Sequence, residues 1–158
     1  MLRLSKLTDY AVVVLLKLSS TRGSGEGVQT SPGIAAATGV PEPTVAKVLK
    51  ALATSGLVAS QRGAHGGYRL LRPLEGIAIA DVIAAIDGPI ALTACVDGAA
   101  TPCEVQGLCA VKGRWDLVNE AIRSALGTIT LAAMREASIP VAFRLDPPTA
   151  ARAPVPLE

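Results

Sequence analysis

The residues of this chain that could do chemistry are its three cysteines. Cys95 and Cys103 are separated by seven residues, and Cys103 and Cys109 by five. The chain between them is rich in Gly, Pro and Asp, which is typical of a loop and not of an apolar core face. Three thiolates within 15 residues of loop can converge on one soft metal centre. The spacing therefore favours metal or cluster binding over cysteines buried for packing.

Other uses of these thiols have less support. A stable disulfide is not expected in a cytosolic protein, and an odd number of cysteines would leave one thiol over. Zinc would need a fourth good ligand, and the loop holds no histidine. A thiol redox enzyme with Cys95 or Cys109 as nucleophile is a rival, but there is no Cys-x-x-Cys pair and the sole histidine, His65, lies in another loop. We see no Ser–His–Asp arrangement, phosphate loop or supported carboxylate pair, and predict no enzyme.

Composition predicts a folded protein outside the membrane. Half of the 158 residues are hydrophobic but only 3% are aromatic, so the core must consist of Ala, Val, Leu and Ile. The longest apolar run is Ala11–Leu16, far short of the roughly 20 residues that a membrane span needs. The N-terminus lacks the order of a signal peptide. We expect a cytoplasmic protein with no membrane partner.

Charge is distributed unevenly along the chain. Residues 1–72 hold nine Lys and Arg against three Asp and Glu, a net charge of 9 − 3 = +6. Residues 73–158 hold six against ten, a net charge of 6 − 10 = −4. This asymmetry indicates a first half that faces a polyanion, with a chance scatter of solvated charges as the alternative.

The basic half is predicted to begin with two helices. Thr8 and Asp9 can cap a first helix that ends near Ser20. Ser31, followed directly by proline, predicts the start of a second, short helix, and Gly39 can end it in the left-handed conformation.

A third helix opens at Pro43 and ends at Gly56. Its apolar residues repeat with the i, i+3, i+4, i+7 spacing of one helix face, namely Val45, Val48, Leu49 and Leu52. The opposite face carries Thr44, Lys47, Lys50 and Thr54. Two short helices joined by a tight turn predict a helix-turn-helix, whose second helix presents a Lys and Thr face to DNA.

A hairpin follows this helix. Residues 57–61 and 68–71 have strand-like composition and flank a glycine-rich segment. A hairpin directly after a recognition-type helix predicts a winged helix. Arg62 at its base can enter a minor groove, where groove narrowing concentrates negative potential. His65 is interpreted as a polar loop residue, with a phosphate contact as the alternative.

Two further helices are predicted around the cysteines. One covers residues 79–86 and ends at Asp87-Gly88-Pro89. After the cysteines comes a long apolar stripe of Trp115, Val118, Ile122, Leu126 and Ile129, with Arg114, Asp116, Asn119, Glu120 and Arg123 on the other faces. A partner helix from a second copy would cover this stripe, and packing onto the chain's own winged domain is the alternative. Thr130 can start one more turn.

Three strings carry a resemblance to a known family: residues 4–11 (LSKLTDYA), 62–70 (RGAHGGYRL) and 88–95 (GPIALTAC). With the order of the parts, they resemble the Rrf-two family of iron–sulfur transcription regulators. That family includes the Isc repressor, the nitric-oxide-sensing repressor, the rhizobial iron regulator and the Suf-operon regulators. The resemblance covers about residues 1–136 and is closest to the regulators of Suf iron–sulfur assembly.

This resemblance implies a homodimer in which Cys95, Cys103 and Cys109 hold an iron–sulfur cluster. A 2Fe–2S cluster is favoured and a 4Fe–4S cluster is the alternative. The resemblance also implies that the helix beginning near Pro43 enters the major groove and that Arg62 enters the minor groove.

The fourth cluster ligand is where the chain departs from part of the family. The Isc type has five residues in the first cysteine gap and a histidine three residues after its last cysteine, where Lys112 stands here. The nitric-oxide-sensing type uses an aspartate of the first helix, supplied by the partner subunit, and Asp9 stands at that place. Asp9 is therefore the candidate fourth ligand, and a helix N-terminal charge favoured by the macrodipole is the alternative.

Together these features predict a mainly α fold in four parts. A winged helix-turn-helix DNA-binding domain spans 1–88, a Cys-rich cluster-binding loop 89–112, a dimerisation helix 113–136 and a disordered Pro-rich tail 137–158. The predicted function is a cluster-sensing repressor of iron–sulfur assembly (suf) genes, and a nitric-oxide or redox-sensing repressor of other genes is the alternative. The residues predicted to contact a double-stranded DNA operator are Pro43, Thr44, Lys47, Lys50, Arg62 and His65.

Overall fold

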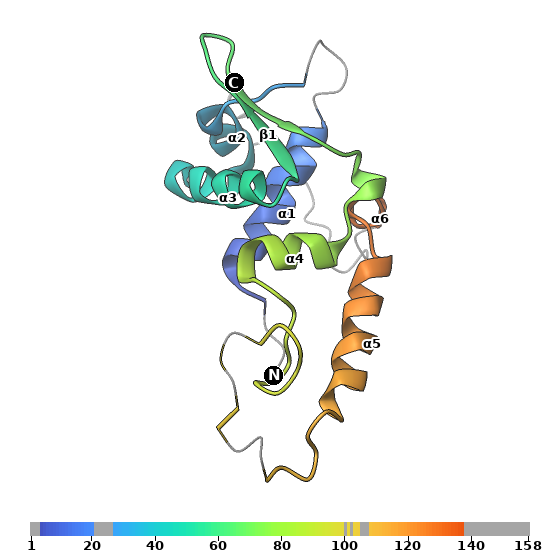
Figure 1. Ribbon diagram of the computed structural model, residues 1–158. Coiled ribbons are helices and arrows are strands. Elements are labelled where there is room, and N and C mark those ends of the chain that lie inside the picture. Colours follow the sequence, from blue (N-terminus) through green and yellow to red (C-terminus); the bar gives the residue numbers. More distant parts are fainter. Residues whose placement is uncertain (1–3, 21–26, 100, 102, 105–107, 138–158) are drawn as a thin grey trace, which may run out of the picture.

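The computed structural model describes residues 4–20, 27–99, 101, 103–104 and 108–137. Within them the chain is mainly helical with one antiparallel hairpin (Figure 1), which confirms the predicted fold class. The elements in chain order are α1 Lys6–Ser19, α2 Ser31–Thr38, α3 Glu42–Thr54, β1 Val58–Gln61, β2 Gly67–Leu70, the 3-10 turn η1 Leu74–Gly76, α4 Ile79–Asp87, α5 Trp115–Thr128 and α6 Leu131–Glu136. The predicted tail at 138–158 lies outside the described residues.

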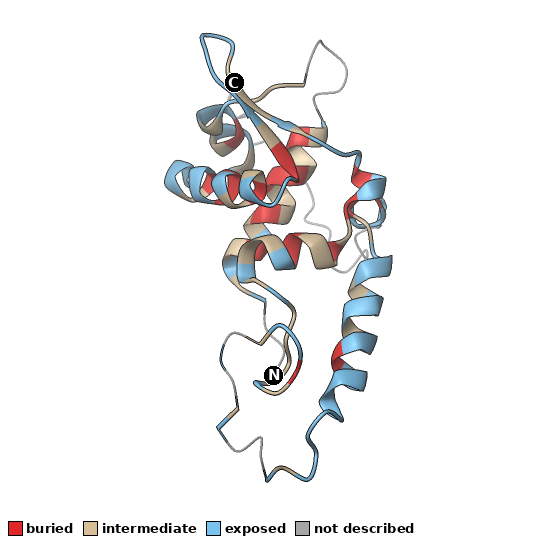
Figure 2. Ribbon diagram, viewed as in Figure 1, coloured by how far each residue is buried: buried red, intermediate tan, exposed pale blue. Residues whose placement is uncertain are grey.

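One core holds α1 to α4 together. The predicted apolar face of α3 is confirmed, because Val45, Val48, Leu49 and Leu52 are all fully buried. Leu15 of α1 and Ile34 of α2 are equally buried in the same cluster. Figure 2 shows the buried positions gathered where these helices meet. Burial of such aliphatic side chains is the main favourable contribution to folding of this domain.

The first helix starts earlier than predicted. Its N-cap is Ser5, whose side chain accepts a hydrogen bond from the Thr8 backbone N–H, so the prediction of Thr8 and Asp9 as caps is wrong. The physical reason is that Thr8 is buried and its hydroxyl donates to Asp87 Oδ2 at 2.7 Å. Asp9 then falls in the first turn, on the exposed side.

The second helix begins one residue before the predicted cap. Thr30 accepts from the Gly33 backbone N–H, so Ser31 is the first helical residue and not the cap. The end is as predicted, since Gly39 adopts the left-handed conformation with φ of 72°. A tight turn of residues 39–41 then leads to α3 and completes the helix-turn-helix.

The hairpin packs closely against the segment before α2, at Gly67 and Tyr68. Strand β1 pairs with β2 in the register Val58 to Leu70, and Tyr68 also exchanges backbone hydrogen bonds of 2.8 and 2.9 Å with Gln29. A Cβ added at Gly67 would lie 2.6 Å from the Gln29 carbonyl oxygen, so no other residue fits there without a backbone shift. The glycine-rich segment therefore shapes the wing through close backbone approach.

The segment after the cysteines contains two helices. Helix α5 extends away from the winged domain, and α6 returns to it (Figure 1). Leu131 of α6 is fully buried, its N–H donates to the Ile77 carbonyl at 2.9 Å, and the Ile79 N–H donates to the Ile129 carbonyl at 2.9 Å. The last helix therefore belongs to the core of the winged domain. No helix in the described part of the chain is long and apolar enough to span a membrane.

Candidate DNA-binding face and cysteine loop

Helix α3 presents its basic side to solvent. Pro43, Lys47 and Lys50 are exposed and Thr44 is half-buried, while the opposite side of the helix faces the core. Pro43 is the second residue of the helix, and Glu42 precedes it. The burial of the apolar side leaves the Lys-bearing side as the surface that this helix can offer to a partner.

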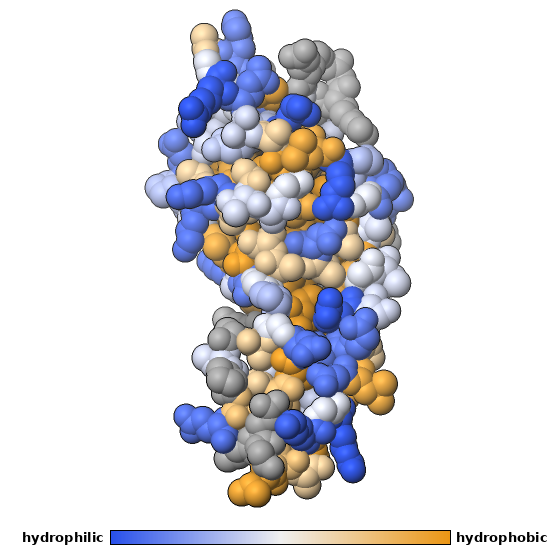
Figure 3. All heavy atoms as spheres, viewed as in Figure 1, coloured by the Kyte–Doolittle hydropathy of each residue, from blue (hydrophilic) through white to orange (hydrophobic). Residues whose placement is uncertain are grey.

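The wing adds a second basic element next to α3. Arg62 and His65 are both exposed in the turn between β1 and β2. A shallow hollow connects the two elements and is lined from both sides by Ala46, Lys50, Ala53, Thr54, Ser60 and Tyr68. Figure 3 shows hydrophilic atoms around the edges of this upper part of the molecule, with hydrophobic atoms between them. The fold thus brings the six predicted DNA-contacting residues to neighbouring surfaces of α3 and the wing.

The three cysteines lie between α4 and α5. All three are free thiols of intermediate exposure. The Thr93 hydroxyl lies 3.2 Å from Cys95 Sγ, within hydrogen-bonding distance of the thiol. Among the described residues no group of three or more His, Cys, Asp or Glu side chains is close enough to hold a metal ion. In this conformation of the single chain, the thiols are therefore in one loop but not gathered at one point.

The other ligand candidates are also solvent-facing. Asp9 is exposed on α1, and Lys112 is exposed in the turns before α5. The loop between the cysteines includes residues outside the described part of the chain, at 100, 102 and 105–107. The described residues thus include all the predicted ligands, but Asp9 and the cysteines do not form a group that could hold a metal ion.

A buried amide joins the cysteine loop to α5. Asn119 is only 4% exposed, its Oδ1 accepts from the Leu92 N–H at 3.0 Å, and its Nδ2 donates to the Ile90 carbonyl at 3.0 Å. The apolar periodicity of α5 placed Asn119 on an outer face, and the structure corrects this. The burial of Asn119 could have been predicted from its spacing. It lies four positions after Trp115 and three before Ile122, which places it in line with the apolar stripe.

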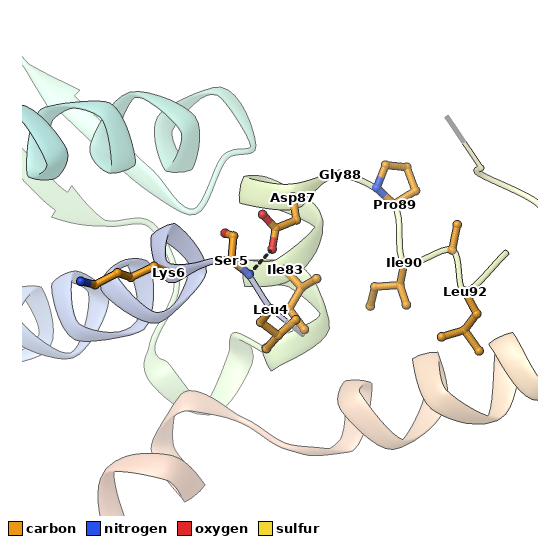
Figure 4. A pocket seen from close by; sticks show the side chains of 10 residues that line it. Leu4, Ser5, Lys6, Ile83, Asp87, Gly88, Pro89, Ile90 and Leu92 are labelled. Atoms are coloured by element: carbon orange, nitrogen blue, oxygen red, sulfur yellow. Dashed lines mark hydrogen bonds between the residues drawn. The ribbon is translucent and has the colours of Figure 1, made fainter. Parts of the chain in front are cut away.

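The loop is tied to α1 at its other end. Asp87, the last residue of α4, accepts from the Ser5 N–H at 3.3 Å and from the Thr8 hydroxyl at 2.7 Å. Partial burial pushes the pKa of Asp87 upward, but the hydrogen bonds from Ser5 and Thr8 outweigh it and hold the pKa below its ordinary value. Figure 4 shows the hydrogen bond between Ser5 and Asp87 beside the hollow bordered by Leu4, Pro89 and Leu92.

The helix-turn-helix, the wing and the exposed Lys side of α3 define a winged-helix DNA-binding transcription regulator. The family model Rrf2, described as an iron-dependent transcriptional regulator, matches residues 4–137. The chain therefore belongs to the Rrf2 (Rrf-two) family.

Two related proteins are named as transcriptional regulators. A Mycobacterium tuberculosis protein named as an HTH-type transcriptional regulator, Rv1287, is 36% identical over 139 residues, which cover 88% of this chain and 84% of the relative. The HTH-type transcriptional repressor NsrR of Streptomyces coelicolor is 28% identical, with 82% and 86% covered.

Solved structures share the architecture. CymR, the global cysteine regulator of B. subtilis, is similar with a TM-score of 0.63 at 26% identity, covering 85% of this chain and 96% of that one. IscR of T. potens has a TM-score of 0.59 at 26% identity, covering 90% and 97%. These likenesses agree with the winged-helix fold and with the prediction that the chain is not an enzyme.

Proposed function

We propose that this regulator senses an iron–sulfur cluster and represses genes of iron–sulfur (suf) assembly. The observation that carries the proposal is the placement of its only three cysteines, all free and half-exposed, in the one loop between the winged domain and α5. Structural cysteines are usually fully buried in apolar surroundings, and these are not. A loop of this kind can close around a ligand and change its connection to α5 when it does.

The chemistry of the donor set fits such a group. Soft thiolates suit iron–sulfur clusters, and Cys95, Cys103 and Cys109 would each supply one. Asp9 is the proposed fourth ligand, because it is exposed on α1 and free to meet the loop of a second copy. The cluster would supply a centre that oxidants, iron starvation or nitric oxide remove. A 2Fe–2S cluster is favoured, with a 4Fe–4S cluster as the alternative.

The proposed DNA contacts divide between two grooves. Thr44, Lys47 and Lys50 would face the major groove from α3, near the helix start at Pro43. Arg62 would enter the minor groove from the wing, and His65 would lie over the phosphates. The exposure of all but the half-buried Thr44 supports this arrangement, since no described part of the chain covers them.

A second copy of the chain is the proposed partner of α5. Trp115, Leu117 and Val118 are 41%, 79% and 42% exposed, so a single chain leaves three large apolar side chains of this helix in water. Figure 3 shows hydrophobic atoms on the lower part of the molecule, toward α5. A homodimer would also set the separation of two α3 helices and so match the two halves of an operator.

A nitric-oxide or redox-sensing repressor of other genes is the second candidate. The placement of Asp9 favours it, because an acidic residue on α1 is the feature by which this chain resembles the nitric-oxide-sensing type. The two candidates share the DNA face and differ in signal and target genes. Operator footprinting upstream of suf genes, with nitric oxide or peroxide added separately, distinguishes them.

The test of cluster binding is spectroscopic. Protein purified or reconstituted under anaerobic conditions should be brown, and its absorption and Mössbauer spectra should report the cluster type. The Cys103→Ala variant should lose the colour, whereas Thr101→Ala, an exposed residue of the same loop, should keep it. A colourless wild-type protein after anaerobic reconstitution would refute the proposal.

A further inference from the structure

Asn119 is an unusual residue for its place on α5. Among described residues 89–128 it and Val96 are the only buried ones, so most of the helix around it lies in solvent. Burying a side-chain amide costs free energy unless its donor and acceptor are both satisfied. Here both are, by the N–H of Leu92 and the carbonyl of Ile90.

The geometry of this contact selects one arrangement of the loop. A carboxamide offers one acceptor and one donor side by side, as a peptide group does. It therefore can bind a carbonyl and an N–H two residues apart on one backbone, as those of Ile90 and Leu92 are. An apolar side chain at position 119 would leave both backbone groups of the loop without these partners.

Cys95 follows this contact at short range. It lies three residues after Leu92, and its sulfur is within 3.2 Å of the Thr93 hydroxyl. Val96, the next residue, is 5% exposed. The hydrogen bonds of Asn119 thus hold the backbone three residues before Cys95 against α5.

The other end of the same segment is fixed on α1. Asp87 binds Ser5 and Thr8, and from Asp87 the chain runs through Pro89 to Ile90, as Figure 4 shows. The segment is thus held on α1 at one end and on α5 at the other. A movement of the cysteine loop that breaks the second attachment would separate α5 from the loop without disturbing the first.

We propose that Asn119 is the positioning residue that couples the cysteine loop to α5. It fixes where Cys95 lies in the absence of any ligand and, resting on the proposed function, transmits the cluster state to the helix that separates the two DNA-reading domains. The coupling acts through the backbone of Ile90 and Leu92 and needs no contact between Asn119 and the cluster.

Hydrogen exchange on metal-free protein tests the positioning role. In Asn119→Ala, amide exchange of the peptide that includes Leu92 should quicken about tenfold, because two hydrogen bonds are lost. Alkylation of Cys95 by iodoacetamide should quicken relative to Cys103 in the same molecule. Ser124→Ala, an exposed change on the same helix, should behave as wild type. Unchanged exchange at Leu92 would overturn the proposal.

A second variant keeps the positioning role testable if Asn119→Ala fails to fold. Asn119→Asp keeps an acceptor for the Leu92 N–H but offers no donor to the Ile90 carbonyl, so it should give an intermediate exchange rate. Retained protection of α3 amides in both variants would show that the winged domain is folded. Full wild-type protection of residues 89–95 in the aspartate variant would also count against the role assigned to the amide.

Operator binding then tests the coupling. The ratio of operator affinities of cluster-loaded and metal-free protein should fall toward one in Asn119→Ala and stay at the wild-type value in Ser124→Ala. An unchanged ratio in Asn119→Ala refutes the coupling and leaves the proposed function standing. If wild-type protein takes up no cluster, the proposed function fails, and exchange and alkylation alone decide the positioning role.

Discussion

The winged domain and the cysteine-bearing part of this chain differ in how much apolar surface each buries by itself. In its described residues the winged domain, with α6 packed back onto it, contains 19 buried hydrophobic residues in one cluster. Among the described residues from 89 to 128, Val96 is the only buried hydrophobic one. The ribbon in Figure 2 shows the same contrast, with α5 exposed along nearly its whole length.

Because of this difference, the two regions are held in their conformations by different interactions. A dense core keeps α3 and the wing in a fixed relation with or without a ligand. A region with one buried apolar side chain and one buried amide opens at low free-energy cost. The proposed DNA face is therefore preformed, whereas the geometry of the proposed sensor depends on what binds to it, either a cluster or a second copy of the chain.

The largest expected effect is on folding. Leu49→Ala, in the fully buried face of α3, should lower the free energy of unfolding by about 2–5 kcal/mol. Val96→Ala in the cysteine loop should cost less than about 1 kcal/mol, because that segment can open without global unfolding. Urea titration of metal-free protein measures both. Equal costs would show that the two regions form one cooperative core.

Operator binding should depend on the winged domain. Arg62→Ala should weaken binding by about 1–3 kcal/mol if the side chain enters a groove. Lys47→Ala and Lys50→Ala should each reduce the salt slope by about one if they contact phosphate. Arg123→Ala, an exposed arginine of α5, is the matched control and should bind as wild type. Gel shifts over a range of salt measure these effects, and wild-type affinity in all three wing and α3 variants would exclude this docking face.

Dimerisation should depend on α5, in the cysteine-bearing part of the chain. Leu117→Glu puts a charge in place of the most exposed large apolar side chain of α5 and should weaken the dimer about tenfold, or about 1.4 kcal/mol. Leu71→Glu, at a leucine that is 49% exposed outside α5, should leave the dimer intact. Sedimentation equilibrium of metal-free protein distinguishes the two. An unchanged dimer in Leu117→Glu would place the interface elsewhere.

The smallest effect concerns the contact between the end of α4, where the cysteine-bearing part begins, and the start of α1. Asp87→Asn should cost about 1 kcal/mol of stability at neutral pH, because a mostly exposed charged acceptor is lost from Ser5 and Thr8. Since folding lowers the pKa of Asp87, its contribution is present above the ordinary value of 3.8 and is lost as the pH falls through the lower folded value. The wild-type and variant stabilities should therefore converge in acid.

The convergence is measured by chemical unfolding at several pH values. Asp97→Asn, which removes an exposed carboxylate of the cysteine loop, is the control and should show no such convergence. A constant difference between wild type and Asp87→Asn down to the most acidic pH would contradict the role given to the Asp87 carboxylate.

Much of the winged domain was predictable because local rules agree with the packing there. The spacing of Val45, Val48, Leu49 and Leu52 identifies the buried side of α3, and the same spacing leaves the Lys residues outside. Gly39 marks a helix end by its backbone freedom alone. The helix caps were less predictable. The Thr8 hydroxyl could cap its own helix or donate a hydrogen bond to a residue distant in the sequence, and it does the second because Asp87 lies beside it.

The sequence by itself determined the class of protein and its candidate chemistry: the basic half, the helix-turn-helix pattern, the wing glycines and three cysteines in one loop are all local features. Only the tertiary structure decided that α6 returns to the core and that Asn119 turns inward to hold the backbone of Ile90 and Leu92. Periodicity could not show this, because it ranks residues by hydrophobicity. The burial of Asn119 depends instead on two backbone groups nearly 30 residues away along the chain.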